Sequence, residues 1–304
     1  MYHIEVEQLT KTYKSTKAVD SVSLKVKEGE VFGMLGRNGA GKSTTIECMT
    51  GLKRFDHGEV RVAGLDPTVQ RKELYGRIGV QLQETAFQNK IKVAELCRLF
   101  ETFYRKPRPY KKLLEAFNLA DKESSYVGDL SGGQRQRLSI VLALIPDPEI
   151  IFLDELTTGL DPQSRRSMWN YIKKLRGEGR TVFLTTHYME EAECLCDRIC
   201  IIDCGKIIAL DTVRSVIDAC GIDSKVTFES TRDIYGILQQ AFPSTAKVER
   251  VGSKYAVTGC CEELLNKVTC VLEHNKLDYR DIDIKRPGLE DAFIKLTGNI
   301  ISEE

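Results

Sequence analysis

Residues 36–44 are the stretch whose types and spacing point most directly to chemistry. They read Gly-Arg-Asn-Gly-Ala-Gly-Lys-Ser-Thr, which fits the pattern G-x-x-x-x-G-K-[ST] with an extra glycine at position 39. An apolar run precedes them at 31–35, and a helix-compatible run follows at 44–52. In a strand–loop–helix context, glycine backbone N–H groups and the positive end of the helix can both face phosphate oxygens. We therefore predict a site for the phosphates of a nucleoside triphosphate.

Two side chains of this loop have specific predicted roles. Lys42 should reach the β- and γ-phosphates, and the Ser43 hydroxyl should take a coordination site of Mg²⁺. A glycine-rich turn without a ligand is the alternative, and the agreement of motif and context disfavours it. The remaining residues of the predicted phosphate cradle are Gly36, Arg37, Asn38, Gly39, Ala40, Gly41 and Thr44.

A pair of acidic residues ends a second apolar run. Residues 150–153 read Ile-Ile-Phe-Leu and are followed by Asp154 and Glu155. A buried strand of this kind places both carboxylates at the carboxyl edge of a sheet, where ligands bind in α/β folds. Asp154 is then the expected partner of Mg²⁺, and Glu155 can act as general base on an attacking water. A strand capped by two solvated acids is the alternative, which the upstream phosphate loop makes less attractive.

A third element, Leu-Ser-Gly-Gly-Gln at residues 130–134, distinguishes between families of nucleotide-binding proteins. It resembles the LSGGQ signature of the ATP-binding cassette (ABC) ATPases. A helix starting near Ser131 would offer N–H groups to an anion. The resemblance implies that Ser131, Gly132, Gly133 and Gln134 close over ATP held by a second ATPase subunit. The active unit would be a head-to-tail homodimer or heterodimer with two shared sites.

The same resemblance implies roles for four other residues. Tyr13 would stack on adenine, with an ordinary strand aromatic as the alternative. Gln83 would meet Mg²⁺ and a membrane partner, although Gln81 competes for this role. Asp161 would communicate across the dimer. His187 would hold the γ-phosphate and the catalytic geometry, with a structural histidine as the alternative.

The patterns along the chain predict an α/β architecture with two domains. Residues 1–220 resemble the P-loop NTPase domain of ABC ATPases, with a RecA-like core, an antiparallel β subdomain and a helical subdomain at about 84–148. Residues 221–304 restart with strands and helices in β-α-β-β-α-β order, which resembles a small ferredoxin-like α+β domain. A length of 304 residues suits two domains.

Composition limits the partners. The formal net charge is +0, which gives no large basic field for nucleic acid, and no apolar run approaches the roughly 20 residues that span a bilayer. The first residues alternate as in a strand rather than a signal peptide. Four of the ten cysteines lie close together, but their spacing is not a zinc pattern. We expect packed free thiols in a reducing cytoplasm at Cys194, Cys196, Cys200 and Cys204.

The segment 286–293 narrows the resemblance. It reads Arg-Pro-Gly-Leu-Glu-Asp-Ala-Phe and is similar to the C-terminal extension of drug-resistance-type ABC exporter ATPases. This implies an ATPase bound peripherally to the cytoplasmic side of the cell membrane, which uses ATP and Mg²⁺ to power export through a separate integral-membrane permease. Leu156 stands where the family usually has proline, so the approach to residues 157–161 should be less rigid.

Two alternatives come from other classes. One is a GTPase, because residues 275–278 match the guanine-reading pattern N-K-x-D. They lie far downstream of Lys42, at the end of an amphipathic helix in the C-terminal region, so we interpret the match as coincidence. The other is a soluble, non-transport ABC ATPase that acts as a nucleotide-dependent switch or binding module. Measured ATP turnover would separate a motor from such a switch.

Overall fold

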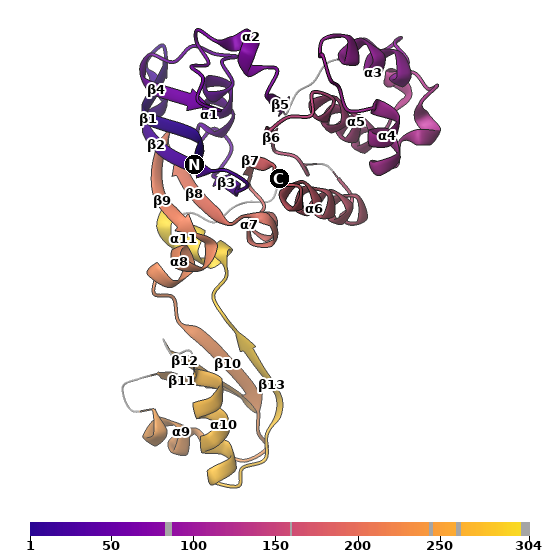
Figure 1. Cartoon of the computed structure of the whole chain (residues 1–304). Helices are drawn as coiled ribbons and strands as arrows, with labels where there is room; N and C mark the ends of the chain where they lie inside the picture. The colour runs from indigo at the N-terminus through magenta and orange to yellow at the C-terminus, as the bar shows by residue number, and fades with distance from the viewer. Residues whose placement is uncertain (83–86, 159, 243–245, 260–262, 299–304) are drawn as a thin grey trace. The chain divides into compact units, whose positions relative to one another are not determined.

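The computed structural model describes residues 1–82, 87–158, 160–242, 246–259 and 263–298 (Figure 1). The chain divides into two compact units, Met1–Val213 and Arg214–Glu304. This division falls seven residues before the predicted boundary at 220/221. A physical reason lies at the end of helix α8 (Val213–Ala219), where the Cys220 thiol donates to the Ala292 carbonyl oxygen at 3.9 Å. Residues 214–220 thereby belong with the second unit.

A six-stranded, mainly parallel sheet forms the centre of the first unit, in the order β5-β6-β7-β3-β8-β9, with only β9 antiparallel to its neighbour. Its strands β3, β6 and β7 are buried at every position, as expected of parallel strands covered on both faces. The bounds are β5 Ile78–Gln81, β6 Ile150–Asp154, β7 Thr181–Thr186, β3 Val31–Leu35, β8 Arg198–Asp203 and β9 Lys206–Thr212.

A separate antiparallel sheet, in the order β2-β1-β4, forms the predicted β subdomain. The strands are β1 Tyr2–Tyr13, β2 Thr16–Lys27 and β4 His57–Val62. Strands β1 and β2 extend well beyond the alternating apolar stretches at 4–8 and 22–26, because their polar ends continue the ladder. This sheet and the central sheet share a core that includes Ile4 and Phe32.

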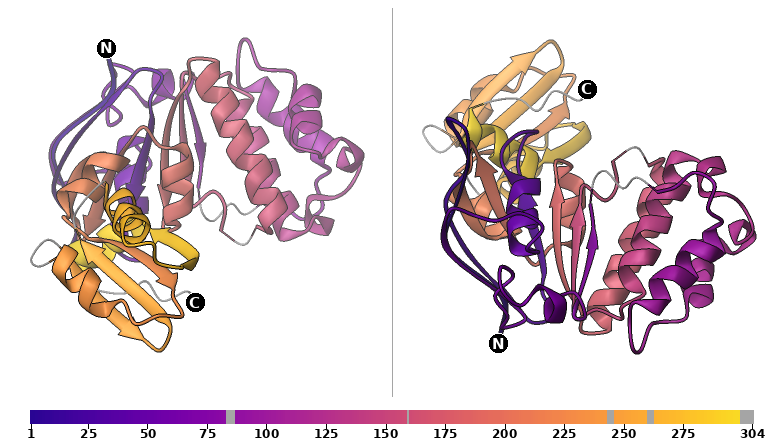
Figure 2. Two further views of the ribbon diagram at one scale, coloured as in Figure 1. Left: turned by 90° about the horizontal axis from the view of Figure 1, so that it is seen from below. Right: turned by 90° about the horizontal axis from the view of Figure 1, so that it is seen from above.

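Helices α3, α4 and α5 form the predicted helical part. Figures 1 and 2 show them together beside the edge of the central sheet that β5 forms. Leu96, Leu113 and Leu138 bring the three helices into one core, which continues into the central sheet through Leu153. The bounds of the helices in this unit are α1 Lys42–Met49, α2 Arg71–Leu74, α3 Val93–Thr102, α4 Tyr110–Ala116, α5 Gly132–Leu144, α6 Pro162–Gly177 and α7 Met189–Leu195, with 3-10 turns at Ala120–Lys122 and Val127–Asp129.

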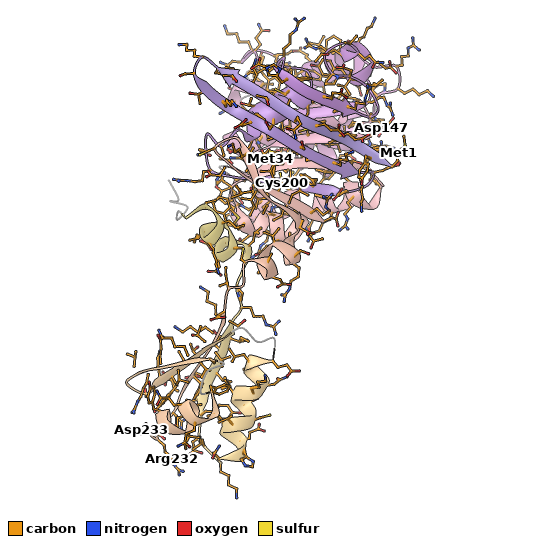
Figure 3. The ribbon with its side chains drawn as sticks, turned by 90° about the vertical axis from the view of Figure 1, so that its left-hand side faces the viewer. Met1, Met34, Asp147, Cys200, Arg232 and Asp233 are labelled. Atoms are coloured by element: carbon orange, nitrogen blue, oxygen red, sulfur yellow. The ribbon has the colours of Figure 1, made fainter. Side chains whose placement is uncertain are left out.

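Cysteine packing follows the prediction in part. Cys200 lies in the interior of the central sheet with Met34, both labelled in Figure 3, and neither is exposed. Cys194 and Cys196 are partly buried free thiols, whereas Cys204 is exposed at the turn between β8 and β9. The prediction of a packed thiol is therefore wrong for Cys204. Within the described ranges, no cluster of His, Cys, Asp or Glu side chains could hold a metal ion.

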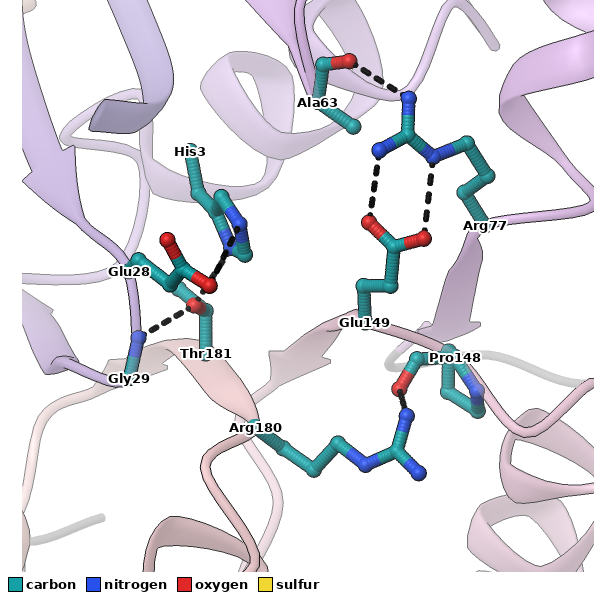
Figure 4. A network of polar contacts seen from close by, with 9 residues as sticks. All are labelled: His3, Glu28, Gly29, Ala63, Arg77, Pro148, Glu149, Arg180 and Thr181. Atoms are coloured by element: carbon teal, nitrogen blue, oxygen red, sulfur yellow. Dashed lines mark hydrogen bonds and ion pairs between the residues drawn. The ribbon is translucent and has the colours of Figure 1, made fainter. Parts of the chain in front are cut away.

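Polar contacts join the strand starts at the amino edge of the central sheet (Figure 4). The Arg77 guanidinium donates to both carboxylate oxygens of Glu149, at 3.2 and 2.7 Å, and to the Ala63 carbonyl oxygen at 2.8 Å. The Thr181 hydroxyl lies 2.7 Å from Nδ1 of His3. Because ligands bind α/β sheets at the opposite, carboxyl edge, we assign these contacts to stability.

The second unit contains a four-stranded antiparallel sheet in the order β11-β12-β10-β13. Its helices α9 and α10 pack through Leu238, Val268 and Leu272 on Phe228 and Tyr255 of the sheet. The succession β10-α9-β11-β12-α10-β13 has the ferredoxin-like order. The bounds are β10 Ser224–Glu229, α9 Tyr235–Ala241, β11 Lys247–Val251, β12 Lys254–Gly259, α10 Leu264–His274, β13 Arg280–Lys285 and α11 Leu289–Thr297. No helix in the described part of the chain is long and apolar enough to cross a bilayer.

Candidate nucleotide site

The predicted phosphate loop connects the carboxyl end of β3 to the first turn of α1. Gly41 has a φ of +107°, and a Cβ there would lie only 2.2 Å from the Ala18 carbonyl oxygen. A Cβ at Gly36 would lie 2.5 Å from the Ile202 carbonyl oxygen. Both positions therefore require glycine for close backbone packing. Gly39, at φ +80°, has open space around it, so its backbone is accessible to a ligand.

Lys42 is buried, and its ammonium group lies against the loop itself. Nζ donates to the carbonyl oxygens of Gly36 at 2.9 Å and Arg37 at 3.1 Å. It is also 3.2 Å from Oε1 of Glu155. The cation and the carboxylate thus neutralise each other where a phosphate is expected. Ser43, at the start of the same helix, is partly buried.

Asp154 and Glu155 are both buried at the carboxyl end of β6. Burial raises the pKa of Asp154, while hydrogen bonding to the Thr185 and Ser43 hydroxyls opposes this shift. For Glu155, the neighbouring His187 side chain and the nearby Lys42 charge hold the pKa below its usual range, against the effect of burial. Glu155 is thereby kept in its carboxylate form, which is the form that a general base needs.

His187 follows β7 and completes this group. Its Nδ1 lies 3.7 Å from Oε1 of Glu155, and its ring centroid lies 4.1 Å from that of Tyr188. Tyr188 in turn has the Arg165 guanidinium 4.5 Å above its ring. Lys42, Glu155 and His187 come from three distant parts of the sequence and converge on one point. This convergence is what a site that activates water beside a phosphate requires.

Of the two glutamines at the end of β5, the structure describes Gln81 alone. Gln83 lies outside the described residues. Gln81 is buried, and its Nε2 donates to the Leu82 carbonyl oxygen at 2.7 Å and to that of Asp154 at 3.4 Å. Its Oε1 is buried without a hydrogen-bond partner in the described part of the chain. Gln81, the alternative to Gln83 in the sequence, therefore lies beside Asp154.

The signature residues form the N-terminus of α5. Ser131 is its N-cap: its hydroxyl accepts from the Gln134 N–H at 3.3 Å, and its own N–H donates to Gln134 Oε1 at 2.9 Å. A Cβ at Gly132 would meet nothing within 4 Å, so this face is open. Gly133 is partly buried against Leu160. The polar contacts of Ser131 stay within its own helix, which leaves its surface available to another molecule.

Asp161 and Tyr13 occupy surface positions. Asp161 is the N-cap of α6, where its carboxylate accepts from the N–H and the hydroxyl of Ser164 at 2.9 and 2.6 Å. These bonds lower its pKa. Tyr13 is 40% exposed, and the ammonium groups of Lys11 and Lys53 each lie 5.5 Å from its ring centroid. The ring is accessible enough for a base to stack on it once these flexible chains move.

Sequence reasoning missed three residues around this site. The Thr185 hydroxyl bonds Asp154 and the Glu155 N–H. Gln136 donates through Nε2 to the Leu156 carbonyl oxygen at 3.1 Å. Glu191 is a buried acid on α7. Only Thr185 had a usable signal, a hydroxyl at the end of a buried strand. The other two become visible only when the helices are in place.

The fold and this site define a nucleoside triphosphatase of the ABC class. The family model described as ABC transporter matches residues 19–158. The chain belongs to this family, as an ATP-binding and ATP-hydrolysing protein of an ABC transporter.

Relatives match almost the whole chain. The daunorubicin resistance ATP-binding protein DrrA2 of Streptomyces coeruleorubidus is 35% identical, over 98% of this chain and 96% of its own length. The Nod factor export ATP-binding protein I of Cupriavidus metallidurans is 39% identical, over 97% of both chains.

Solved structures match the larger part of the chain. An ATP-binding subunit of an ABC transporter has a TM-score of 0.67 and 26% identity, over 72% of this chain and 93% of its own. A dimeric bacterial ABC transporter cassette has a TM-score of 0.62 and 29% identity, over 69% of this chain and 98% of its own.

Proposed function

We propose that this chain is the cytoplasmic ATPase subunit of an export-type ABC transporter whose permease is a separate polypeptide. The convergence of Lys42, Glu155 and His187 at the carboxyl edge of the central sheet is the observation that carries the enzymatic part. The transport part is supported by the relatives over the full length. One of them is named for daunorubicin resistance and the other for Nod factor export, so their likeness does not select a substrate.

ATP binding has to rearrange the Lys42–Glu155 pair. The Lys42 ammonium would leave Glu155 and the loop carbonyl oxygens for the β- and γ-phosphates, which are stronger anionic partners. Glu155 is then released to accept a proton from a water that it orients together with His187. Such catalysis consists of positioning and electrostatic stabilisation rather than covalent chemistry.

The oxygen donors at the site suit Mg²⁺. The Ser43 hydroxyl is close enough to Asp154 to lower its pKa, and the unpartnered Oε1 of Gln81 is on the strand next to Asp154. Hydroxyl, carboxylate and amide oxygens are the hard ligands that Mg²⁺ prefers. We propose that Ser43 and Asp154 hold it, with Gln81 or Gln83 as the third protein group. When bound, it would neutralise charge on the phosphates.

The open N-terminus of α5 supports a shared site. Gly132 and Ser131 are exposed, and in the described part of the chain no hydrogen bond joins Ser131 to the phosphate loop of its own chain. We propose that they bind the γ-phosphate of ATP held by a second ATPase subunit, either an identical copy or a paralogue. Backbone N–H groups at a helix start are well suited to this role.

An apolar groove supports docking of the permease. It has a volume of about 370 Å³ and lies between β5 and the helical part. Its lining includes Tyr75, Leu82, Phe87, Phe100 and Tyr104. An amphipathic helix of a permease loop fits such a surface, because its apolar face would cover the aromatic side chains. Gln81 also lines the groove, so docking there is next to the nucleotide site.

Co-purification from membranes tests the transport part. The wild-type chain, extracted in mild detergent, should retain an integral-membrane permease. Phe100→Asp should lose the permease while keeping its own ATP turnover, because it places a charge in the apolar groove. Phe100 also packs against the core, so the melting temperature of the variant is measured alongside. Phe103→Asp is the matched control, since Phe103 is 66% exposed, directly follows the same helix as its C-cap, and is absent from the groove lining. An exclusively soluble wild-type assembly would favour the non-transport alternative.

A further inference from the structure

We propose that Glu191 is a positioning residue, which fastens helix α7 to the turn after Glu155 when its unpaired Oε2 and the unpaired Thr157 hydroxyl close a buried hydrogen bond. The inference rests on the proposed function, in which Glu155 and His187 act on the same water. It gives the buried acid of α7 a role in keeping these two residues at their working separation.

The turn that follows Glu155 is held from two sides by its backbone. Glu155 itself adopts a φ of +50°, and its N–H donates to both the carbonyl and the hydroxyl oxygen of Thr185 at 3.1 Å. Gln136, on the signature helix, binds the Leu156 carbonyl oxygen. Leucine at position 156 lacks the fixed φ of proline, so this turn depends on such contacts for its shape.

Glu191 lies beside this turn, close to Thr157. Its side chain is buried, and Oε1 accepts from the Trp169 indole N–H at 3.2 Å. Oε2 has no partner of good hydrogen-bond geometry in the described part of the chain, and the buried Thr157 hydroxyl also lacks one. The hydroxyls of Thr157 and Thr186 are nevertheless close enough to lower the pKa of Glu191. A small shift therefore joins two buried polar groups that are otherwise costly to leave unpaired.

The carboxyl group suits this contact in its neutral form. Burial raises the pKa of Glu191, and this effect outweighs those of the neighbouring Thr186, Thr157 and Trp169 side chains and of the nearby Arg165 charge. Arg165 lies against the Tyr188 ring, as described above. A protonated carboxyl can both donate and accept, so it can serve Thr157 and Trp169 together.

The position of α7 explains why the contact matters for hydrolysis. The helix begins at Met189, two residues after His187, so its placement directs the histidine. Its link to Thr157 fixes the histidine relative to Glu155, two residues before Thr157. The same carboxyl group connects the pair to α6 through Trp169. A displacement of about 1 Å at such a pair is enough to lower a rate by about a hundredfold.

Steady-state ATP hydrolysis by the full chain tests the proposal. Glu191→Leu, which keeps the volume but removes the polar group, should lower kcat by about tenfold or more and leave KM for ATP within about twofold. Glu191→Gln should restore most of the rate, because its amide also donates and accepts. As a single change, Thr157→Val should also lower kcat. In the Glu191→Leu background it should add little, since both changes remove the same contact. Glu190→Ala, at an exposed position of α7, is the control.

Three results would overturn the proposal. They are a Glu191→Gln variant as slow as Glu191→Leu, additive effects of Thr157→Val and Glu191→Leu, and a loss found only in KM or in the melting temperature. The last would make Glu191 a core residue alone. Failure of the proposed function can be told apart from failure of this proposal. It would appear as full ATP turnover in Glu155→Gln, independently of the rates of the Glu191 variants.

Discussion

Lys42 and Glu155 form a buried ion pair where a phosphate and a reacting water are expected. In this arrangement the ammonium group of Lys42 pairs with the carboxylate of Glu155. The remaining N–H groups of the ammonium donate to the loop carbonyl oxygens. The neighbouring His187 keeps Glu155 charged. Because the folded-state pKa of Glu155 is lowered, its capacity to act as a base is present at neutral pH and is lost as the pH falls through that pKa.

Glu155→Gln is the change that separates binding from hydrolysis. The amide cannot accept a proton from water, so turnover should fall by about a hundredfold or more. ATP affinity should be equal or higher, because Lys42 no longer has a charged competitor. Turnover and equilibrium ATP binding measure the two effects. Lys42→Ala is the contrasting variant and should lose productive binding; an undiminished rate in Glu155→Gln would remove Glu155 from the general-base role.

Much of this site follows from sequence because its residues end buried strands. Asp154 and Glu155 follow an apolar run, and His187 follows another, so their shared edge was predictable before the strand order was known. Gln136 and Glu191 were not predictable, since their contacts depend on how helices α5 and α7 pack around one turn. Local motifs report strand ends, whereas contacts between helices depend on the tertiary structure.

At the scale of elements, the starts of α5 and α6 combine two uses of the same chemistry. Ser131 caps α5 and Asp161 caps α6. The family resemblance implies that both residues also act on a neighbouring subunit. A cap holds the first turn in shape, and that turn presents its N–H groups outward. The sequence pattern identified the functional residues but did not show that their own side chains close the helix ends.

Asp161→Ala and Asp161→Asn distinguish the cap from a role across the dimer. Alanine removes the acceptor for Ser164, which should lower the free energy of unfolding by about 1 kcal/mol. Asparagine also caps well, so its stability should stay close to that of the wild type. Chemical denaturation measures this difference. Should both variants melt like the wild type, the Ser164 contacts contribute nothing to stability. A low ATPase rate in Asp161→Asn alone would isolate the inter-subunit role.

At the scale of the molecule, the chain contains two units with separate cores. The second unit packs α9 and α10 on its sheet through a cluster of its own. The predicted boundary at 220/221 differs from the observed division because an apolar pattern cannot show that Cys220, directly after α8, contacts Ala292 of α11. The exposed sheet side of this unit includes Lys225, Glu229 and Lys254, a mixture of charges without catalytic geometry. We propose a role in pairing two ATPase subunits.

Removing residues 214–304 tests that role. The remaining unit keeps both sheets and every described residue of the nucleotide site, so ATP binding should persist. Dimerisation of the Glu155→Gln form in the presence of ATP should weaken by about tenfold if the second unit contributes even about 1.4 kcal/mol to pairing. Analytical ultracentrifugation with and without ATP measures the fractions of monomer and dimer. Unchanged dimer stability would argue against a pairing role.

The central claim is that each ATP site combines the phosphate loop of one subunit with the signature of another. Mixing two inactive variants of the full chain, Lys42→Ala and Ser131→Arg, tests it directly through ATP turnover. Neither variant alone has an intact composite site. A mixed dimer has one site with both defects and one with neither, so hydrolysis should reappear on mixing. Hydrolysis that stays absent at every mixing ratio, or a Ser131→Arg chain that is fully active alone, would contradict the shared site.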